Sequence, residues 1–399
     1  MNYKKRRTEL LKQLDENSMM ILYSDKPNNQ NYFYLTGIKR ENMILTLDNI
    51  GGEYHEKLYI EKPDALMEKW NGKRMTLEEA KNISQIEEVT YTDGFESIFT
   101  RLIVTGAINS IYFNINRQSI DANPDINEKK AKFYQSKYPY LNIKNAYHLI
   151  GLLRMEKDQD EINEIKTAIL RTKIALSDVL KKLKPGMYEY QVQADFEYSI
   201  KYQGSLHPAF DTIAGSGYNA TMLHYGTNHC QCQDGDLILL DLGAESNGYC
   251  ADISRTYPLN GKYTERQKQI YDIVLKANLE VIKEAKPGKS LTELNELCKD
   301  ILAEGLIELE IIKDKNEISK YYMHGVGHHL GIDVHDVTIA SSTVLKPGNI
   351  ITDEPGLYIE EENIGIRIED DLLITEDGCI VLSKDIIKTT EEIEVFMAK

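Results

Sequence analysis

HGVGHHLGIDVHD, residues 324–336, holds four of the nine histidines of the chain within twelve consecutive positions. Imidazoles at this density are typical of a metal site or a proton-transfer site, because histidine ligates metals and changes its charge near neutral pH. The stretch therefore predicts a site of one of these two kinds.

Further segments supply the carboxylates that a hard metal ion requires. Asp241 and Asp252 lie in LLDLGAESNGYCADISRTYP, Glu354 lies in TDEPGLYI, and Glu369 lies in GIRIEDD. Four carboxylates exceed what one tetrahedral zinc usually takes, and no two cysteines form a CxxC pair. A site with two metals fits better, because two cations about 3.5 to 4 Å apart activate a water and polarise a carbonyl. The chemistry that this predicts is hydrolysis.

The two aspartates also have a simpler interpretation. An aspartate after an apolar run, such as Asp241, commonly caps a strand or a turn. However, if residues 237–242 and 250–257 are the arms of a hairpin that turns at Asn247-Gly248, Asp241 and Asp252 lie on neighbouring strands. The pair is therefore geometrically plausible as a set of ligands.

Residues 364–371 show strict alternation of apolar and polar side chains. Arg367, Glu369 and Asp371 fall on the face opposite the three isoleucines. Taken alone, such a polar face is usually solvated.

The order Asp, Asp, His, Glu, Glu inside these motifs resembles the metallopeptidases of the pita-bread fold, and most closely the Xaa-Pro aminopeptidases, also called aminopeptidase P. The resemblance is strong over about residues 150–385 and weaker in the motifs RRTELL and NYFYLTGI near the start. It implies metal ligands at Asp241, Asp252, His328, Glu354 and Glu369. It also implies an α+β fold: a smaller creatinase-type α/β domain (residues 1–150) precedes a catalytic pita-bread domain of the creatinase/aminopeptidase type (residues 151–399).

The same resemblance implies roles for further side chains. Glu354 orients the attacking water or accepts its proton, and His224, His324 and His335 manage charge and protons on the intermediate and the leaving nitrogen. Arg367 hydrogen-bonds the carboxylate ligands and holds their geometry. His329 is expected in the pocket wall, and Tyr358 either joins this network or is a simple core tyrosine. Without the resemblance, His224 is more commonly a structural loop histidine.

A ligand set of oxygen with one imidazole favours two divalent ions of manganese, with cobalt, iron or zinc as alternatives. The expected substrates are peptides with an Xaa-Pro N-terminus. Three other functions stay open: a prolidase, which cleaves only Xaa-Pro dipeptides, a metal-free creatinase-like C–N hydrolase, and a non-catalytic peptide-binding module. The metal carboxylates disfavour the last two.

Composition limits the remaining possibilities. Among 399 residues, 42% are hydrophobic and 28% charged, as in an ordinary globular protein, and the length predicts two domains. A net charge of -16 argues against a nucleic-acid partner. Five cysteines without a disulfide framework, and no apolar stretch of membrane-spanning length or signal-peptide pattern, predict a cytoplasmic protein with no membrane contact. The resemblance further implies a homo-oligomer, either a dimer or a tetramer.

Local patterns predict the arrangement of elements. Short apolar runs at 19–23, 43–47, 57–60 and 110–114 indicate strands in an α/β unit. The charged run 156–161 marks a helix start and the domain boundary. The helix after it carries an apolar pattern at Ile162, Ile165, Ala168, Ile169, Thr172, Ile174 and Ala175. Lys-Pro-Gly at 184–186 and 286–288 precedes a helix each time and hints at an internal repeat, while Lys-Pro-Gly at 346–348 does not.

Overall fold

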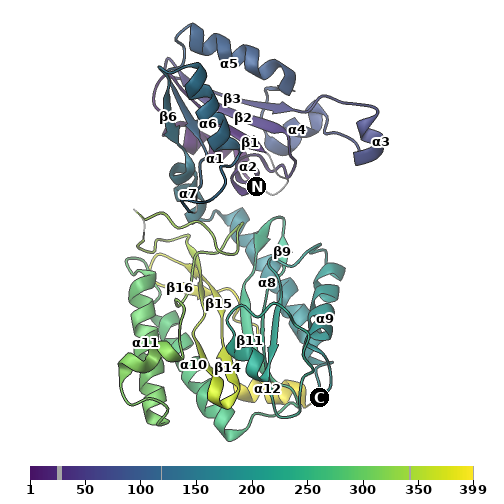
Figure 1. Cartoon of the computed structure of the whole chain (residues 1–399), viewed down its shortest axis with the longest axis vertical. Coiled ribbons are helices and arrows are strands. Elements are labelled where there is room, and N and C mark those ends of the chain that lie inside the picture. Colours follow the sequence, from purple (N-terminus) through teal and green to yellow (C-terminus); the bar gives the residue numbers. More distant parts are fainter. Residues whose placement is uncertain (25–28, 118, 341–342, 399) are drawn as a thin grey trace. The chain divides into compact units, whose positions relative to one another are not determined.

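The computed structural model describes residues 1–24, 29–117, 119–340 and 343–398. The chain divides into two compact units, Met1–Arg154 and Met155–Lys399. Figure 1 colours the first unit purple to blue and the second teal to yellow.

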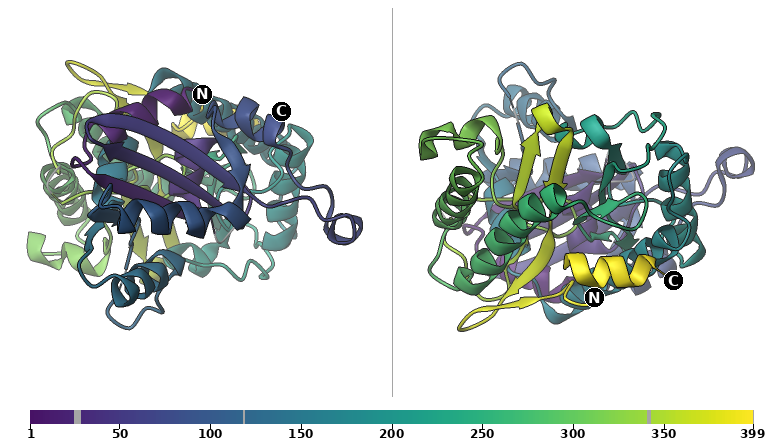
Figure 2. Two further views of the ribbon diagram at one scale, coloured as in Figure 1. Left: turned by 90° about the horizontal axis from the view of Figure 1, so that it is seen from above. Right: turned by 90° about the horizontal axis from the view of Figure 1, so that it is seen from below.

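The first unit is built on one six-stranded mixed sheet in the order β4-β3-β2-β1-β5-β6 (Figure 2). The strand β2 runs antiparallel to both neighbours, and the other three pairings are parallel. The four predicted apolar runs form strands of this sheet, so that prediction is confirmed. The strands are β1 (Ser18–Ser24), β2 (Met43–Ile50), β3 (Glu53–Ile60), β4 (Val89–Tyr91), β5 (Ser110–Phe113) and β6 (Asn142–Asn145).

Aromatic rings fill the core of the first unit. Phe95 stacks on Phe99 with 5.5 Å between ring centroids, and Phe99 meets Tyr134 edge-on at 4.7 Å. These rings pack with apolar side chains of β1 and β5, which brings two helices onto one side of the sheet. The helices in this part are α1 (Tyr3–Leu11), α2 (Gln30–Thr36), α3 (Met67–Asn71), α4 (Leu77–Ser84), α5 (Phe95–Val104), α6 (Ile126–Lys137) and α7 (Tyr147–Met155), with the 3-10 turn η1 (Thr92–Gly94).

Two pairs of packed helices flank the strands of the second unit, α8 (Gln159–Leu180) with α9 (Glu189–Tyr202) and α10 (Glu265–Glu284) with α11 (Leu291–Glu308) (Figure 1). The second helix of each pair follows a Lys-Pro-Gly sequence. Gly186 and Gly288, the glycines of these sequences, both have a φ of 89°, a value that favours glycine. The helices predicted after residues 186 and 288 are thus confirmed. The repeated helix pairs agree with an internal repeat.

Two three-stranded antiparallel sheets lie between the helix pairs, in the orders β11-β8-β7 and β12-β15-β16. Among the described residues of this unit, β9 with β10 and β13 with β14 form two further short antiparallel pairs. The elements are β7 (Ile213–Ser216), η2 (Gly217–Thr221), β8 (Leu237–Leu242), β9 (Glu245–Ser246), β10 (Tyr249–Cys250), β11 (Ile253–Pro258), η3 (Lys315–Lys320), β12 (Ile350–Asp353), β13 (Gly356–Ile359), η4 (Glu360–Glu362), β14 (Ile364–Arg367), β15 (Asp370–Ile374), β16 (Cys379–Val381) and α12 (Thr390–Met397).

Helix α8 begins where the charged run predicts. The Asp158 side chain caps it, and Glu161 bonds back to the Asp158 amide, which completes a capping box. All predicted apolar positions are buried except Ile174, whose side chain is 41% exposed, so that member of the pattern is wrong. The buried stripe passes through Thr172 and Ala175, and position 174 therefore turns toward solvent.

Two general features bear on the environment of the protein. All five cysteines are free of disulfides. Among the described residues, no helix combines the length and apolar character that crossing a bilayer would take.

Candidate metal centre

The two predicted aspartate ligands lie on one strand and directly before its neighbour. Strand β8 pairs antiparallel with β11, Asp241 lies opposite Ser254, and Asp252 directly precedes β11. Asn247 and Gly248 have φ values of 45° and 89° and turn the chain between β9 and β10. The predicted hairpin with its turn is confirmed, with the addition that β9 and β10 form their own short pair.

The alternating segment 364–371 is not one strand. Its first half, β14, pairs with β13, and its last residues enter β15, which pairs with β12. The solvated interpretation of its polar face is wrong, because Arg367, Glu369 and Asp371 are all buried. The change of partner strand at Glu369 places protein on both sides of the chain.

The predicted ligands converge on one point. Donor atoms of Asp252, His328 and Glu369 lie within 4.8 Å of one another. The His328 Nε2 atom is 3.4 Å from Asp252 Oδ2 and 3.7 Å from Glu354 Oε1. The fifth predicted ligand, Asp241, is near enough for its charge to act on Asp252, Glu354 and Glu369.

Crowding of buried carboxylates makes this centre electrostatically unfavourable without a cation. Burial, followed by the charges of Glu369 and Asp241, raises the pKa of Asp252 well above its usual value. Burial and the Asp241 charge, opposed by Arg367, raise the pKa of Glu354 to about 7. Like charges this close disfavour ionisation, and a multivalent cation removes that penalty.

Two details show that the donor atoms suit a metal ion. The Asp241 Oδ1 atom is buried and has no hydrogen-bond partner, so one carboxylate oxygen is available as a ligand. The His328 Nδ1 atom lies 3.0 Å from the carbonyl oxygen of His329 and donates to it. This bond leaves the lone pair of Nε2 directed toward the carboxylates, as a ligating imidazole requires.

Arg367 joins three groups around the centre. Its Nη2 donates to Asp241 Oδ2 at 2.6 Å, its Nε to Ser254 Oγ at 2.8 Å, and its Nη1 to the Tyr358 hydroxyl at 2.9 Å. Tyr358 is fully buried and donates to His324 Nε2 at 2.7 Å. The guanidinium thus fixes the Asp241 carboxylate, and Tyr358 belongs to this network.

The other predicted histidines differ in their surroundings. Both ring nitrogens of His324 are engaged, since Nδ1 donates to the Gly325 carbonyl at 2.8 Å and Nε2 accepts from Tyr358. His335 is exposed, and its ring centroid lies 4.1 Å from that of His328. His224 is also exposed and is near enough to His324 for its charge to contribute, after burial, to a lowered pKa of His324. His329 is buried and lies outside the group of clustered donor atoms.

Ser254 is a functional candidate that the motifs did not single out. Its hydroxyl donates to Glu369 Oε2 at 2.7 Å and accepts from Arg367. The available signal was its position two residues after Asp252, which places both side chains on one face of an extended chain.

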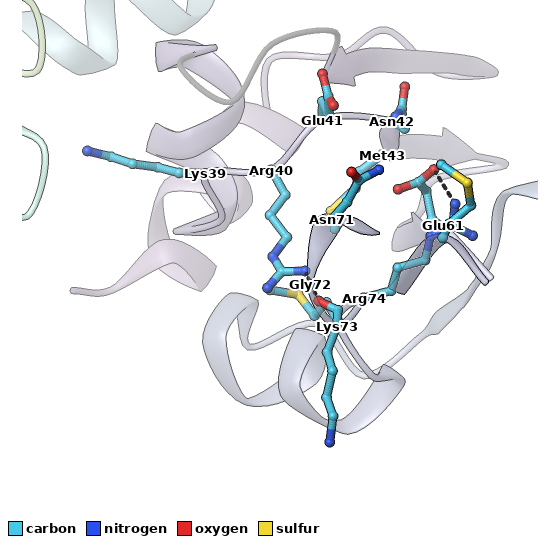
Figure 3. Close-up of a pocket in the computed structure, with 12 residues that line it drawn as sticks. Lys39, Arg40, Glu41, Asn42, Met43, Glu61, Asn71, Gly72, Lys73 and Arg74 are labelled. Carbon is cyan, nitrogen blue, oxygen red and sulfur yellow. Dashed lines mark hydrogen bonds and ion pairs between the residues drawn. The ribbon is translucent and has the colours of Figure 1, made fainter. Parts of the chain in front are cut away.

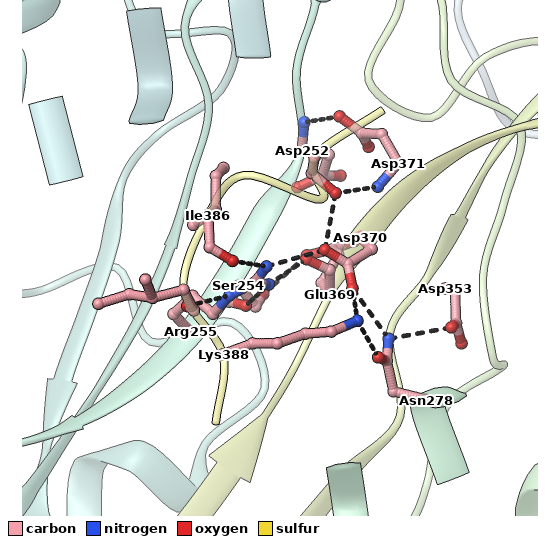
Figure 4. A network of polar contacts seen from close by, with 12 residues as sticks. Asp252, Ser254, Arg255, Asn278, Asp353, Glu369, Asp370, Asp371, Ile386 and Lys388 are labelled. Atoms are coloured by element: carbon pink, nitrogen blue, oxygen red, sulfur yellow. Dashed lines mark hydrogen bonds and ion pairs between the residues drawn. The ribbon is translucent and has the colours of Figure 1, made fainter. Parts of the chain in front are cut away.

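Behind the ligands lies a buried charge network, shown in Figure 4. Arg255 donates to Asp370 Oδ1 at 2.8 Å and to the Glu369 carbonyl at 2.5 Å, and Lys388 donates to Asp370 Oδ2 at 2.7 Å. Although burial raises it, the charges of Arg255 and Lys388 hold the pKa of Asp370 well below its usual range. Asn278 connects Asp370 with Asp353. The network connects β11, β12 and β15, the strands that lie next to the predicted ligands Asp252, Glu354 and Glu369 in the sequence.

A separate cavity of about 360 Å³ lies in the first unit (Figure 3). Within it, Arg74 pairs with Glu61 at 3.4 Å and Arg40 donates to the Lys73 carbonyl at 3.0 Å. None of the predicted site residues lines this cavity.

Comparison with known proteins identifies the family of the chain. Residues 163–376 match metallopeptidase family M24, and residues 3–112 match the aminopeptidase P N-terminal domain. The fold and the site define a metal-dependent peptidase with the pita-bread fold. The chain belongs to metallopeptidase family M24.

Individual relatives match over nearly the whole chain. The Xaa-Pro aminopeptidase of Escherichia coli is 30% identical, with 99% of this chain and 97% of that protein covered. The Xaa-Pro dipeptidase of Pyrococcus furiosus is also 30% identical, over 96% of this chain and 98% of that protein. The solved structure of a provisionally assigned aminopeptidase P from Bacillus anthracis has a TM-score of 0.97 at 44% identity, covering 99% of this chain and 97% of that one.

Proposed function

We propose that this protein is an Xaa-Pro aminopeptidase that releases the N-terminal residue from peptides with proline in the second position, with two divalent metal ions, preferably manganese. The observation that carries the proposal is the convergence of His328 with the buried carboxylates of Asp252 and Glu369, beside which Asp241 keeps an oxygen without a hydrogen-bond partner. The names of the Escherichia coli and Bacillus anthracis proteins support the substrate class.

Asp241, Asp252, His328, Glu354 and Glu369 would hold the ions, and oxygen with one imidazole is a donor set that suits manganese. When bound, the ions supply Lewis acidity and lower the pKa of water. Glu354, at the edge of the cluster, orients the attacking water and accepts its proton. The attack falls on the carbonyl that precedes proline.

Histidines and the arginine complete the proposed machinery. His224 and His335 are exposed at the centre and can donate or accept protons on the intermediate and the leaving nitrogen. His324 acts together with Tyr358, because its Nε2 accepts a hydrogen bond from the Tyr358 hydroxyl at 2.7 Å. Arg367 fixes Asp241 through its hydrogen bond of 2.6 Å.

A second candidate function is that of an Xaa-Pro dipeptidase. The Pyrococcus furiosus relative bears that name and matches 96% of this chain, so the site by itself is compatible with both activities. The two differ in the length of the peptide that is accepted.

The test is hydrolysis of an Xaa-Pro-Yaa tripeptide and an Xaa-Pro dipeptide by metal-stripped protein, before and after manganese is added. We expect release of the first residue from the tripeptide only with metal. Cleavage of the dipeptide alone would assign the dipeptidase function to this protein instead. Cleavage of neither peptide would contradict both candidate functions.

A pair of matched variants tests the ligand set. Glu369→Ala removes a predicted ligand, whereas Glu376→Ala removes an exposed carboxylate from the same unit. We expect the first to abolish manganese binding, measured by calorimetry, as well as activity, and the second to preserve both. Full activity in Glu369→Ala would contradict the two-metal site.

We further propose a cytoplasmic location and a homo-oligomeric state. The five disulfide-free cysteines support a reducing compartment. The dimer or tetramer rests on the resemblance to aminopeptidase P, and light scattering on the purified protein tests it.

A further inference from the structure

Glu189, the first residue of α9, is fully buried and surrounded by hydrogen-bond donors. Its Oε1 atom accepts from the Ser216 amide and hydroxyl, both at 2.8 Å, and from Asn219 Nδ2 at 3.0 Å. Its Oε2 atom accepts from the Tyr225 hydroxyl at 2.8 Å and the Cys230 amide at 2.9 Å. Among the described residues, no lysine or arginine pairs with it. The hydrogen bonds themselves therefore stabilise this carboxylate.

All five donors belong to residues 216–230, the segment that connects β7 with β8 and carries His224. Tyr225, the residue directly after His224, is buried and held by Glu189. On the other side of His224, Leu223 packs against the small apolar cluster formed by Ala220, Leu239 and Tyr358. Since Tyr358 bonds His324, this packing brings the segment against the metal centre.

A second anchor lies beyond His224. Asn228 has a φ of 46°, and its side chain donates to the Thr212 carbonyl at 2.6 Å and to Gln193 Oε1 at 3.0 Å. It also accepts from the Ala214 amide at 3.0 Å. The backbone is thus fixed on both sides of His224, whose own side chain stays exposed.

A carboxylate is the group that this position requires. It has only acceptor oxygens, and each of its five contacts comes from a donor. A glutamine of equal size would turn an amide NH₂ toward two or three of those donors and leave them unsatisfied. The start of a helix also favours negative charge, because unpaired backbone N–H groups point outward there.

We propose that Glu189 is a positioning residue for His224: its five hydrogen bonds fix residues 216–230 so that the His224 imidazole is held at the metal centre. This inference rests on the role assigned to His224 in the proposed function. None of the five hydrogen bonds of Glu189 involves a predicted metal ligand. Its loss therefore acts on the catalytic step and not on metal binding.

A double-mutant cycle tests this role. With manganese and the Xaa-Pro-Yaa tripeptide, we expect Glu189→Gln to lower kcat by about 10- to 100-fold, as misplacement of a catalytic group does. KM and the manganese affinity measured by calorimetry should change little. In a His224→Ala background, Glu189→Gln should cause no further fall in kcat, because nothing is left to position.

Glu161→Gln is the matched control. Glu161 is likewise a buried glutamate in the first turn of a helix, and it accepts a hydrogen bond from Tyr249 at 3.1 Å, outside residues 216–230. We expect its kcat to equal that of the wild type. If Glu189→Gln fails to fold, Tyr225→Phe takes its place in the same double-mutant cycle. This variant removes one of the five donors to Glu189 and should cause a smaller fall in kcat.

The outcomes separate this inference from the proposed function. If Glu189→Gln lowers kcat by the same factor in the wild-type and His224→Ala backgrounds, Glu189 has a general structural role, and the inference is overturned. Wild-type kcat in Glu189→Gln, beside a reduced kcat in His224→Ala, would overturn it too. Wild-type kcat in His224→Ala would instead remove the proposed role of His224 and the inference with it, and an inactive wild type would contradict the proposed function.

Discussion

At the scale of single residues, Ser254 connects two side chains that the sequence placed in the site. Its hydroxyl donates to Glu369 and accepts from Arg367, which also holds Asp241. A hydroxyl is suited to this position because it donates and accepts at once. Two predicted ligands are thereby oriented through one small side chain.

Ser254→Ala should weaken manganese binding by about 10- to 100-fold, because a partner that orients a ligating carboxylate is lost. Calorimetric titration of the metal-stripped protein measures this. Ser199→Ala, which removes a serine hydroxyl bonded to Asp178 on α8, is the control and should leave the affinity unchanged. An unchanged affinity in Ser254→Ala would show that Glu369 needs no such support.

At the scale of elements, η2 and β14 approach each other at the distance of backbone contact. A Cβ atom built on Gly365 of β14 would lie 1.9 Å from the Ala220 carbonyl oxygen of η2. Only glycine leaves room for this packing. The contact presses the segment that carries His224 against the strand that carries Arg367.

Gly365→Ala should therefore lower the free energy of unfolding by about 1 to 3 kcal/mol through overpacking. Thermal unfolding measures it, with a fall of about 2 to 4 °C for each kcal/mol in a unit of this size. Gly378→Ala is the matched control, since its added Cβ meets nothing within 4 Å. Equal melting temperatures in the two variants would contradict the close approach.

Strand β1 and helix α6 share a buried pair of phenols in the first unit. Tyr134 donates to Glu96 at 2.8 Å, which leaves Tyr23 to donate to the Tyr134 oxygen at 3.0 Å. Burial raises the pKa of both tyrosines. Their neutral forms are therefore favoured in the folded state.

This pair predicts a loss of stability at alkaline pH. The contribution is fully present below about pH 10, the pKa of an unfolded tyrosine, and falls above it by up to about 1.4 kcal/mol per pH unit for each phenol. Urea unfolding at pH 9 and pH 11 measures it, and Tyr23→Phe should show a smaller loss than the wild type. Exposed Tyr140→Phe is the control, and equal losses in all three proteins would contradict the prediction.

At the scale of the whole molecule, all five predicted ligands belong to the unit Met155–Lys399 but come from distant parts of it. Asp241 lies on β8, Asp252 directly precedes β11, and His328 lies in the stretch 324–336. Glu354 follows the end of β12, and Glu369 follows the end of β14. Only the folded chain brings them together. Metal binding should therefore favour the folded state over the unfolded one.

Manganese at 100 times its dissociation constant should stabilise the wild type by about 2.7 kcal/mol. Differential scanning calorimetry would show a higher melting temperature with metal, reversed by a chelator. Glu369→Ala should lose the shift, and Glu376→Ala should keep it. A melting temperature that does not respond to manganese would show that the centre is not formed from these residues.

The sequence alone determined much of this protein, because the information was local. Short apolar runs identified four of the six strands of the first unit, and a helical pattern after the charged run 156–161 identified the helix at 159–180. Five motifs in a fixed order indicated the family, which the comparisons confirm. Their spacing also predicted that Asp241 and Asp252 lie on adjacent strands.

Other features were decided by tertiary structure, because they depend on which elements pair and pack together. The polar face at 364–371 is buried, since β13 and β12 pair with its two halves. The position of Ser254 two residues after Asp252 placed it near the ligands but did not indicate its bond with Glu369, 115 residues later. Nothing local to Glu189 indicated five donors between 27 and 41 residues away. Burial and hydrogen-bond partners of this kind depend on which elements pack together, and a short window of sequence does not contain that information.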